Sequence, residues 1–119
     1  MSTNSILESI KSMLGIENEY THFDSVIMMH INTVLMTLNQ LGVGPEKGFT
    51  VRNNSETWID FIGNTKEMEA IKSYTYLNVR LLFDPPSSSF LVSAIERQLN
   101  ELTWRIEAQA SAILNDLIE

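Results

Sequence analysis

Apolar residues recur every three or four positions along most of this chain, which is the spacing of helices that bury one face. Between the periodic stretches lie glycines, prolines or paired asparagines, which end helices. The pattern therefore predicts an all-α fold, a compact bundle of about five helices. They are expected over about residues 4–14, 23–41, 55–62 and 65–83, and from Ser87 or Ser88 to the C-terminus.

The second stretch, from Phe23 to Leu41, carries the broadest apolar surface. A helix that is apolar over so much of its circumference is usually the buried centre of an all-α domain. The sequence Gly-Val-Gly-Pro at residues 42–45 cannot continue it, so we expect the helix to end there. Beyond it the periodicity is weak, and only residues 48–51 could form a short extended piece.

Short polar residues mark the expected starts of two further helices. Ser55 is placed to cap the third helix, and Asn64 or Thr65 to cap the fourth. Glu67 and Glu69 then fall near the positive end of the fourth helix's dipole, which favours acidic side chains. The simplest interpretation of this acidic pair is helix stabilisation.

The sequence Phe-Asp-Pro-Pro at residues 83–86 separates the last two helices. A proline pair fixes two φ angles and removes two amide donors, so it predicts a stiff joint. Asp84 is placed as the N-cap of the last helix, with Pro85 at its first position. The phenylalanine before the corner could pack against Phe90 or Leu91 and hold the angle. An ordinary helical-hairpin turn would also explain this corner.

The last stretch runs for some thirty residues without glycine or proline. As one helix it would span about 45 Å, more than the ~30 Å expected across such a small domain, so we expect its far end to project. After Arg105 it carries no positive charge, only acids beside small and aliphatic residues. Such a face beyond the core is typical of a segment that binds a partner, although folding back onto the body is the simpler alternative. Residues 108–119 are therefore a candidate docking tail within a single domain, 1–119.

The composition excludes several classes of binding site. The 119 residues suit one domain, and fifteen acidic against eight basic residues give a net charge of −7. No stretch gathers lysine and arginine into a patch for nucleic-acid phosphates. There is no cysteine, so thiolate metal sites and disulfides are excluded. Neither a signal-peptide pattern nor an apolar run of ~20 residues is present. We therefore expect a soluble intracellular product, or part of a particle assembled inside a cell, without a membrane span.

Candidate catalytic groups are few. His22 and His30 lie eight residues apart, about 12 Å along a helix, too far to chelate one metal ion unaided. We interpret His22 as a surface residue and His30 as half-buried. The serines at 87–89 lack the context of a nucleophile elbow, and no phosphate loop is present. The sequence predicts no enzyme and no catalytic, cofactor-binding or metal-binding residue.

Four segments in fixed order resemble the head–tail connector (adaptor) proteins of tailed bacteriophages. They are LGVGPEKGF (41–49), ETWIDF (56–61), the stretch from Tyr74 that ends in RLLFDPP at Pro86, and ELTWRI (101–106). The likeness covers about residues 5–109, and its strongest element is Phe-Asp-Pro-Pro followed some fifteen residues later by Glu-Leu-x-Trp-Arg.

The resemblance implies a small helical virion protein that forms a ring, commonly of twelve copies, below the portal protein. DNA is retained by it after packaging and later passes through it without sequence-specific binding. A neck, stopper or tail-completion protein is expected below the ring, and assembly in the cytoplasm of the host bacterium. The resemblance implies no cofactor and no membrane. Acidic residues facing the channel would let DNA slide.

Two sets of residues follow from the resemblance and the composition together. The expected portal-docking anchors are Ile113, Leu114, Leu117 and Ile118. For the motif residues a fold-keeping role is expected, since tryptophan is usually buried. These residues are Phe83, Asp84, Pro85, Pro86, Glu101, Trp104 and Arg105.

Other functions remain open at this stage. A different neck or assembly component, such as a stopper or a tail assembly chaperone, fits the same residues. A small helical DNA-binding regulator fits less well, because a recognition helix needs exposed basic and amide side chains. The two later helices carry only scattered cations among acids.

Overall fold

The computed structural model describes residues 5–63 and 65–118, and it describes side chains as far as Gln109. Five helices account for most of these residues, and an isolated bridge between Ser5 and Thr57 is the single β-type pairing among them. The all-α prediction is confirmed. In chain order the helices are α1 (Ile6–Met13), α2 (Asp24–Gln40), α3 (Trp58–Ile62), α4 (Met68–Phe83) and α5 (Ser89–Ile118).

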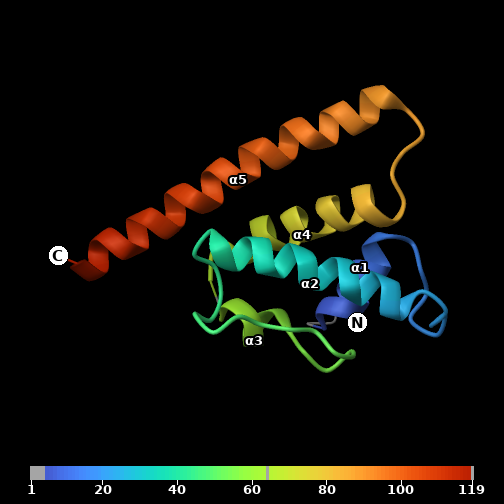
Figure 1. Ribbon diagram of the computed structural model, residues 1–119, viewed down its shortest axis with the longest axis horizontal. Coiled ribbons are helices and arrows are strands. Elements are labelled where there is room, and N and C mark those ends of the chain that lie inside the picture. Colours follow the sequence, from blue (N-terminus) through green and yellow to red (C-terminus); the bar gives the residue numbers. More distant parts are fainter. Residues whose placement is uncertain (1–4, 64, 119) are drawn as a thin grey trace.

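The helix α2 supplies much of the core, as its broad apolar surface predicted. It packs against α1 and α4, and α4 in turn packs against α5 (Figure 1). The helix ends at Gln40, and Gly42 follows with a φ of 97°, a conformation that glycine adopts without strain. The buried side chains of α2 are Ile27, Ile31, Val34, Leu35 and Leu38.

A buried lysine joins α1 to the start of α2. Lys11 is 2% exposed, and its Nζ donates to the carbonyl oxygens of Asn18 (3.0 Å) and Tyr20 (2.8 Å). The same Nζ lies 2.9 Å from Asp24 Oδ1, and this ion pair is the described partner of that buried oxygen. The ammonium group thus donates hydrogen bonds to two backbone carbonyls and forms an ion pair with the Asp24 carboxylate. The loop between α1 and α2 is held to both helices by this side chain.

Replacing Lys11 with methionine is expected to lower the free energy of unfolding by about 2–3 kcal/mol. The methionine fills similar space but leaves two backbone carbonyls without their donor and the Asp24 carboxylate without its cation. Urea unfolding followed by circular dichroism measures the change. Lys72→Met is the control, because Lys72 lies 3.8 Å from the exposed Glu69 and should contribute less than ~0.5 kcal/mol. Equal losses of unfolding free energy in the two variants would contradict the role of Lys11 in joining the loop to α1 and α2.

The segment between α2 and α3 is held against α2 by two amide side chains. Asn32 Nδ2 donates to the carbonyl oxygen of Val51 (2.9 Å), and Asn32 Oδ1 accepts from the Val51 N–H (2.7 Å). Asn39 Nδ2 donates to the carbonyl oxygen of Pro45 (2.6 Å). The expected extended piece at 48–51 forms no strand, and the Asn32 side chain makes both hydrogen bonds to the Val51 backbone.

Two predicted helix starts are wrong. Thr57, not Ser55, caps α3: Thr57 Oγ1 accepts from the Asp60 N–H (3.1 Å), and Asp60 Oδ2 accepts from the Thr57 N–H (3.2 Å). This reciprocal capping box satisfies two amides, whereas Ser55 belongs to the turn before it and donates its N–H to Asn53 Oδ1.

The start of α4 also differs from the prediction. The helix begins at Met68, and Glu67 takes the cap position without a side-chain hydrogen bond. Thr65 Oγ1 instead accepts from the Glu67 N–H (3.3 Å) in the preceding turn, and Asn64 lies outside the described residues. Glu69 does fall in the first turn, where the helix dipole favours it.

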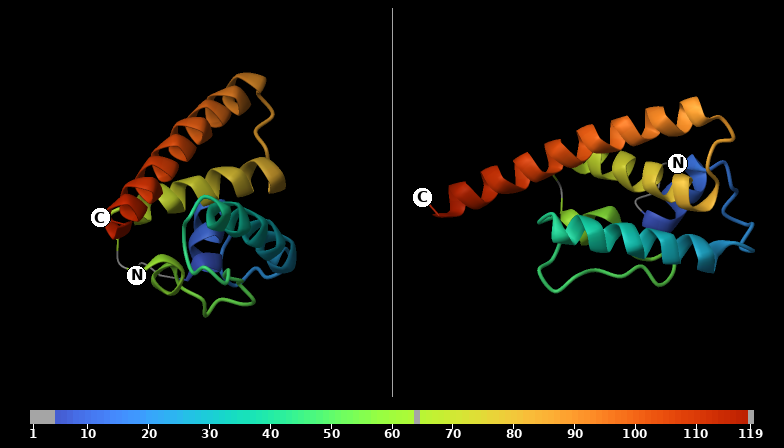
Figure 2. Two further views of the ribbon diagram at one scale, coloured as in Figure 1. Left: turned by 60° about the vertical axis from the view of Figure 1, so that its left-hand side comes forward. Right: turned by 45° about the horizontal axis from the view of Figure 1, so that its top comes forward.

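The helix α5 crosses the body and extends beyond it. Leu99, Leu102 and Ile106 are its buried side chains among the described ones. Its thirty residues correspond to about 45 Å at 1.5 Å per residue, close to the molecule's longest dimension of 48 Å. The C-terminal end of the helix projects past the other elements (Figures 1 and 2), which confirms the expected projection.

Candidate assembly surfaces

The corner between α4 and α5 is a non-helical turn over residues 84–88. The predicted N-cap role of Asp84 is wrong, because Asp84 ends α4: its N–H donates to the Arg80 carbonyl oxygen (2.9 Å), and its own carbonyl accepts from Arg80 Nε (2.8 Å). A proline disfavours the α conformation at the residue before it, so Pro86 keeps Pro85 from opening a helix. The cap of α5 is Ser88, whose Oγ accepts from the Leu91 N–H (3.3 Å).

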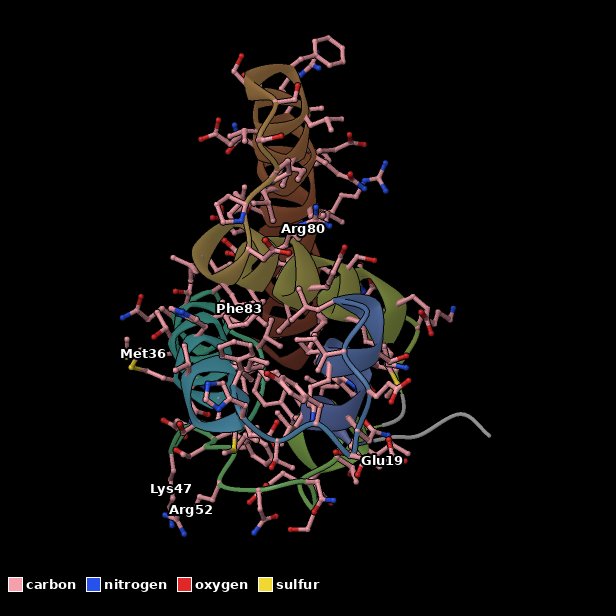
Figure 3. All side chains as sticks on the ribbon, turned by 90° about the vertical axis from the view of Figure 1, so that its right-hand side faces the viewer. Glu19, Met36, Lys47, Arg52, Arg80 and Phe83 are labelled. Carbon is pink, nitrogen blue, oxygen red and sulfur yellow. The ribbon has the colours of Figure 1, made fainter. Side chains whose placement is uncertain are left out.

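Phe83, the last residue of α4 before this corner, contacts Phe23 at the N-cap of α2. Its ring packs edge-on against Phe23, with ring centroids 5.4 Å apart. Phe90 and Leu91, the expected partners, are 73% and 51% exposed. Figure 3 shows Phe83 beside the start of α2 and Arg80 on the neighbouring turn of α4. This aromatic contact joins the end of α4 to the residue before α2.

Trp104 lies on the surface of α5 with 71% of its area exposed, so the expectation that this motif tryptophan is buried is wrong. Its neighbours Leu102 and Ile106 take the buried positions, and a helix turns each successive residue by about 100°, which directs Trp104 outward. Glu101 and Arg105 form an exposed ion pair one turn apart, with 2.6 Å between Arg105 Nη2 and Glu101 Oε1. The fully buried tryptophan of the fold is Trp58 in α3.

The predicted docking tail continues α5. The helix extends to Ile118, so Ile113, Leu114, Leu117 and Ile118 all belong to its last two turns. Their side chains lie outside the described residues, and their docking role stays a prediction. What the fold contributes is position: the tail is at the projecting end of the helix, away from α1 and α2 (Figure 2).

A second candidate contact surface lies along α2. The apolar periodicity of the sequence did not indicate that side chains on this side of the helix are exposed. Val26, Met29 and Met36 are 40%, 59% and 59% exposed and lie along one side of the helix. Lys47 and Arg52 line the same surface hollow as Met36 and are labelled on the same side of the molecule in Figure 3. Neither belongs to any ion pair within the described part of the chain. This side of the subunit is apolar and carries two cations, whereas the chain as a whole has a net charge of −7.

Possible metal ligands do not cluster among the described residues. No cluster of three or more His, Cys, Asp or Glu side chains is found there. His22 is exposed, where its ring contacts Phe23 at 4.8 Å between centroids, and His30 is half-buried, as the sequence indicated for both. None of the described helices combines the length and hydropathy needed to span a membrane.

Comparison with known protein families finds a match to the model described as phage connector protein, over residues 6–112. This match covers nearly the whole chain, including the corner and Trp104. The chain belongs to the phage connector protein family. No curated protein and no solved structure matches it.

Family membership makes this connector a structural component of the phage particle and confirms the resemblance first seen in the four ordered segments. The matched region includes all of the described side chains of α5 and stops before the last turns of the tail. The surfaces of the connector that remain exposed in the single subunit are therefore candidates for contacts with other proteins of the particle. They are the outward side of α5, the methionine side of α2 and the projecting tail.

Proposed function

We propose that this connector is the adaptor of the head–tail junction, a ring subunit that docks below the portal and through which DNA is retained and later ejected. The observation that carries the proposal is the family match over residues 6–112. The projecting end of α5 supports it, because a subunit that joins two parts of a particle needs a segment that reaches beyond its own core.

Ring formation needs two different faces on each subunit, since a head-to-tail contact closes by rotation. The connector presents exposed apolar side chains on separate helices, α2 and α5, as such a contact requires. The methionines of α2 suit this role, because an unbranched thioether side chain adapts to its partner's shape. Twelve copies, a neck or stopper protein below the ring and residence in the virion complete the proposal.

The charge of the chain supports a channel role. Fifteen acidic residues against eight basic ones repel a phosphate backbone, and DNA must move through the ring without binding to it. We expect acidic side chains to line the channel, while the Lys47 and Arg52 side of the subunit faces a neighbouring protein.

Addition of the purified connector to cognate portals or DNA-filled capsids is expected to build a collar at the portal vertex. Sedimentation separates the loaded particles, and negative-stain microscopy shows whether the collar is present. The matched control uses the same capsids without added connector. Absence of a collar, together with absence of this chain from finished particles, would contradict the adaptor role and favour an assembly chaperone.

A further inference from the structure

The outward side of α5 carries a second periodic stripe, opposite the buried Leu99 and Ile106. Its residues are separated by alternating steps of four and three, which is the spacing of a coiled-coil seam. Two of them, Phe90 and Trp104, are 73% and 71% exposed. The stripe, here called the outer ridge, consists of Phe90, Ala94, Arg97, Glu101, Trp104 and Ala108.

We propose that the outer ridge pairs with the same ridge of a second copy, with the two α5 helices antiparallel. In that arrangement each large residue of the ridge meets a small one. Phe90 lies opposite Ala108 of the second copy, and Trp104 lies opposite Ala94. Two-fold symmetry repeats both contacts, so the ridge is complementary to itself along its whole length of about 27 Å.

The charges at the centre of the ridge fit the same alignment. Arg97 lies opposite Glu101 of the second copy, and symmetry repeats this pair as well. Glu101 already accepts from Arg105 in its own helix through Oε1, and a carboxylate has a second oxygen free for another guanidinium. Arg97 has no ion pair within the described residues. A parallel, in-register pair would instead place Arg97 against Arg97 and Trp104 against Trp104.

The exposed area corresponds to a weak, reversible contact. An aromatic side chain buries about 150–250 Å², so the four aromatic residues of the pair would contribute roughly 600 Å² at their present exposure. The rest of the two ridges adds to this, and stable interfaces start at about 1,200 Å². The exposed ion pairs add specificity and alignment more than affinity.

The fold leaves room for the second copy. The outer ridge faces away from α4, since Leu99, Leu102 and Ile106 on the opposite side are buried against the body. Figure 1 shows α5 along the margin of the molecule, with the rest of the chain on one side of it. The bodies of two copies would therefore lie on opposite sides of the paired helices, and residues 109–118 would remain outside the seam.

A two-fold contact of this kind is closed, because it uses the same patch on both copies and cannot propagate into a ring. The pair is thus a form of the free protein that differs from any ring. If the proposed adaptor ring uses the outward side of α5, pairing keeps free subunits from assembling into a ring before they meet a portal. This consequence rests on the proposed function, whereas the pairing itself does not.

Charge exchange tests the pairing and its direction. Arg97→Glu sets two carboxylates against each other at both central contacts of the pair, and Glu101→Arg sets two guanidinium groups against each other there. Each variant alone should therefore self-associate at least ~10-fold more weakly than the natural chain. An equimolar mixture of the two should regain association, because both charge contacts of the mixed pair then join opposite signs. Sedimentation velocity over a concentration series measures all of these samples.

The outcomes separate this contact from others. The proposal is overturned if the natural chain stays monomeric at every concentration. It is also overturned if the mixture of the two variants associates no more than either variant alone, because that result is expected when the chain self-associates through another face. Circular dichroism melting checks that both variants fold. Collar formation on portals is measured separately, so a failure of pairing does not count against the adaptor role.

Discussion

Replacing Trp58 with alanine is expected to lower the free energy of unfolding by about 3–5 kcal/mol, a large part of the stability of a domain this small. Trp58 is fully buried at the start of α3, and its Nε1–H donates to Ser9 Oγ (3.1 Å) in α1. The hydroxyl of Ser9 donates in turn to the Ser5 carbonyl oxygen (2.6 Å). Truncation would open a cavity and break the link that holds α3 to the first helix.

The second tryptophan provides the matched control. Trp104→Ala removes the same atoms from a side chain that is 71% exposed, so unfolding of the monomer should change by less than ~0.5 kcal/mol. Urea unfolding is measured at low protein concentration, where pairing through α5 does not contribute. Similar losses in the two variants would contradict the assignment of Trp58 to the core and Trp104 to the surface.

Removing the C-terminal tail is expected to abolish portal binding while the fold remains. A chain that ends at Gln109 keeps Leu99, Leu102 and Ile106, the described core contacts of α5, so its unfolding free energy should change little. It loses the four aliphatic residues that we propose as anchors. Each buried aliphatic side chain contributes about 1.5–3 kcal/mol, so even partial burial of the four accounts for a loss in affinity of at least ~100-fold.

A full-length variant separates the anchors from the length of the helix. Serine at positions 113, 114, 117 and 118 should match the truncation in a portal-collar assay, whereas Ser111→Ala with Asn115→Ala, on the same turns, should bind as the natural chain does. Normal collar formation by the chain that ends at Gln109 would remove the tail from the proposal and leave the other exposed surfaces as candidates.

Helix content was predictable because it depends on local spacing. The i, i+3, i+4 pattern of α2 and the glycines after it are local features, and they indicate the extent of that helix without reference to the rest of the chain. The same holds for α5, whose length and projection follow from thirty residues without a breaker. Helix starts were less predictable, because several short polar residues compete for each cap. Only the reciprocal contact of Thr57 with Asp60 distinguishes the true cap of α3.

The candidate surfaces were predictable in part. The tail was indicated by composition, since apolar residues beyond the expected core need a partner. The outer ridge was missed, although its four-three spacing is present in the sequence. The reason is that α5 carries two periodic stripes, and spacing cannot say which one faces the body.

The sequence by itself determined five helices and a corner at two prolines, because each depends on residue types at short separations. Its composition determined the acidic net charge, and the order of four segments along the chain indicated the connector family. Tertiary structure alone decided that Trp58 is buried and Trp104 exposed, that Phe83 packs against Phe23, and that Lys11 joins the first two helices. These outcomes depend on which helix faces meet across the body. Burial is a property of the packed set of helices, and no single segment contains that information.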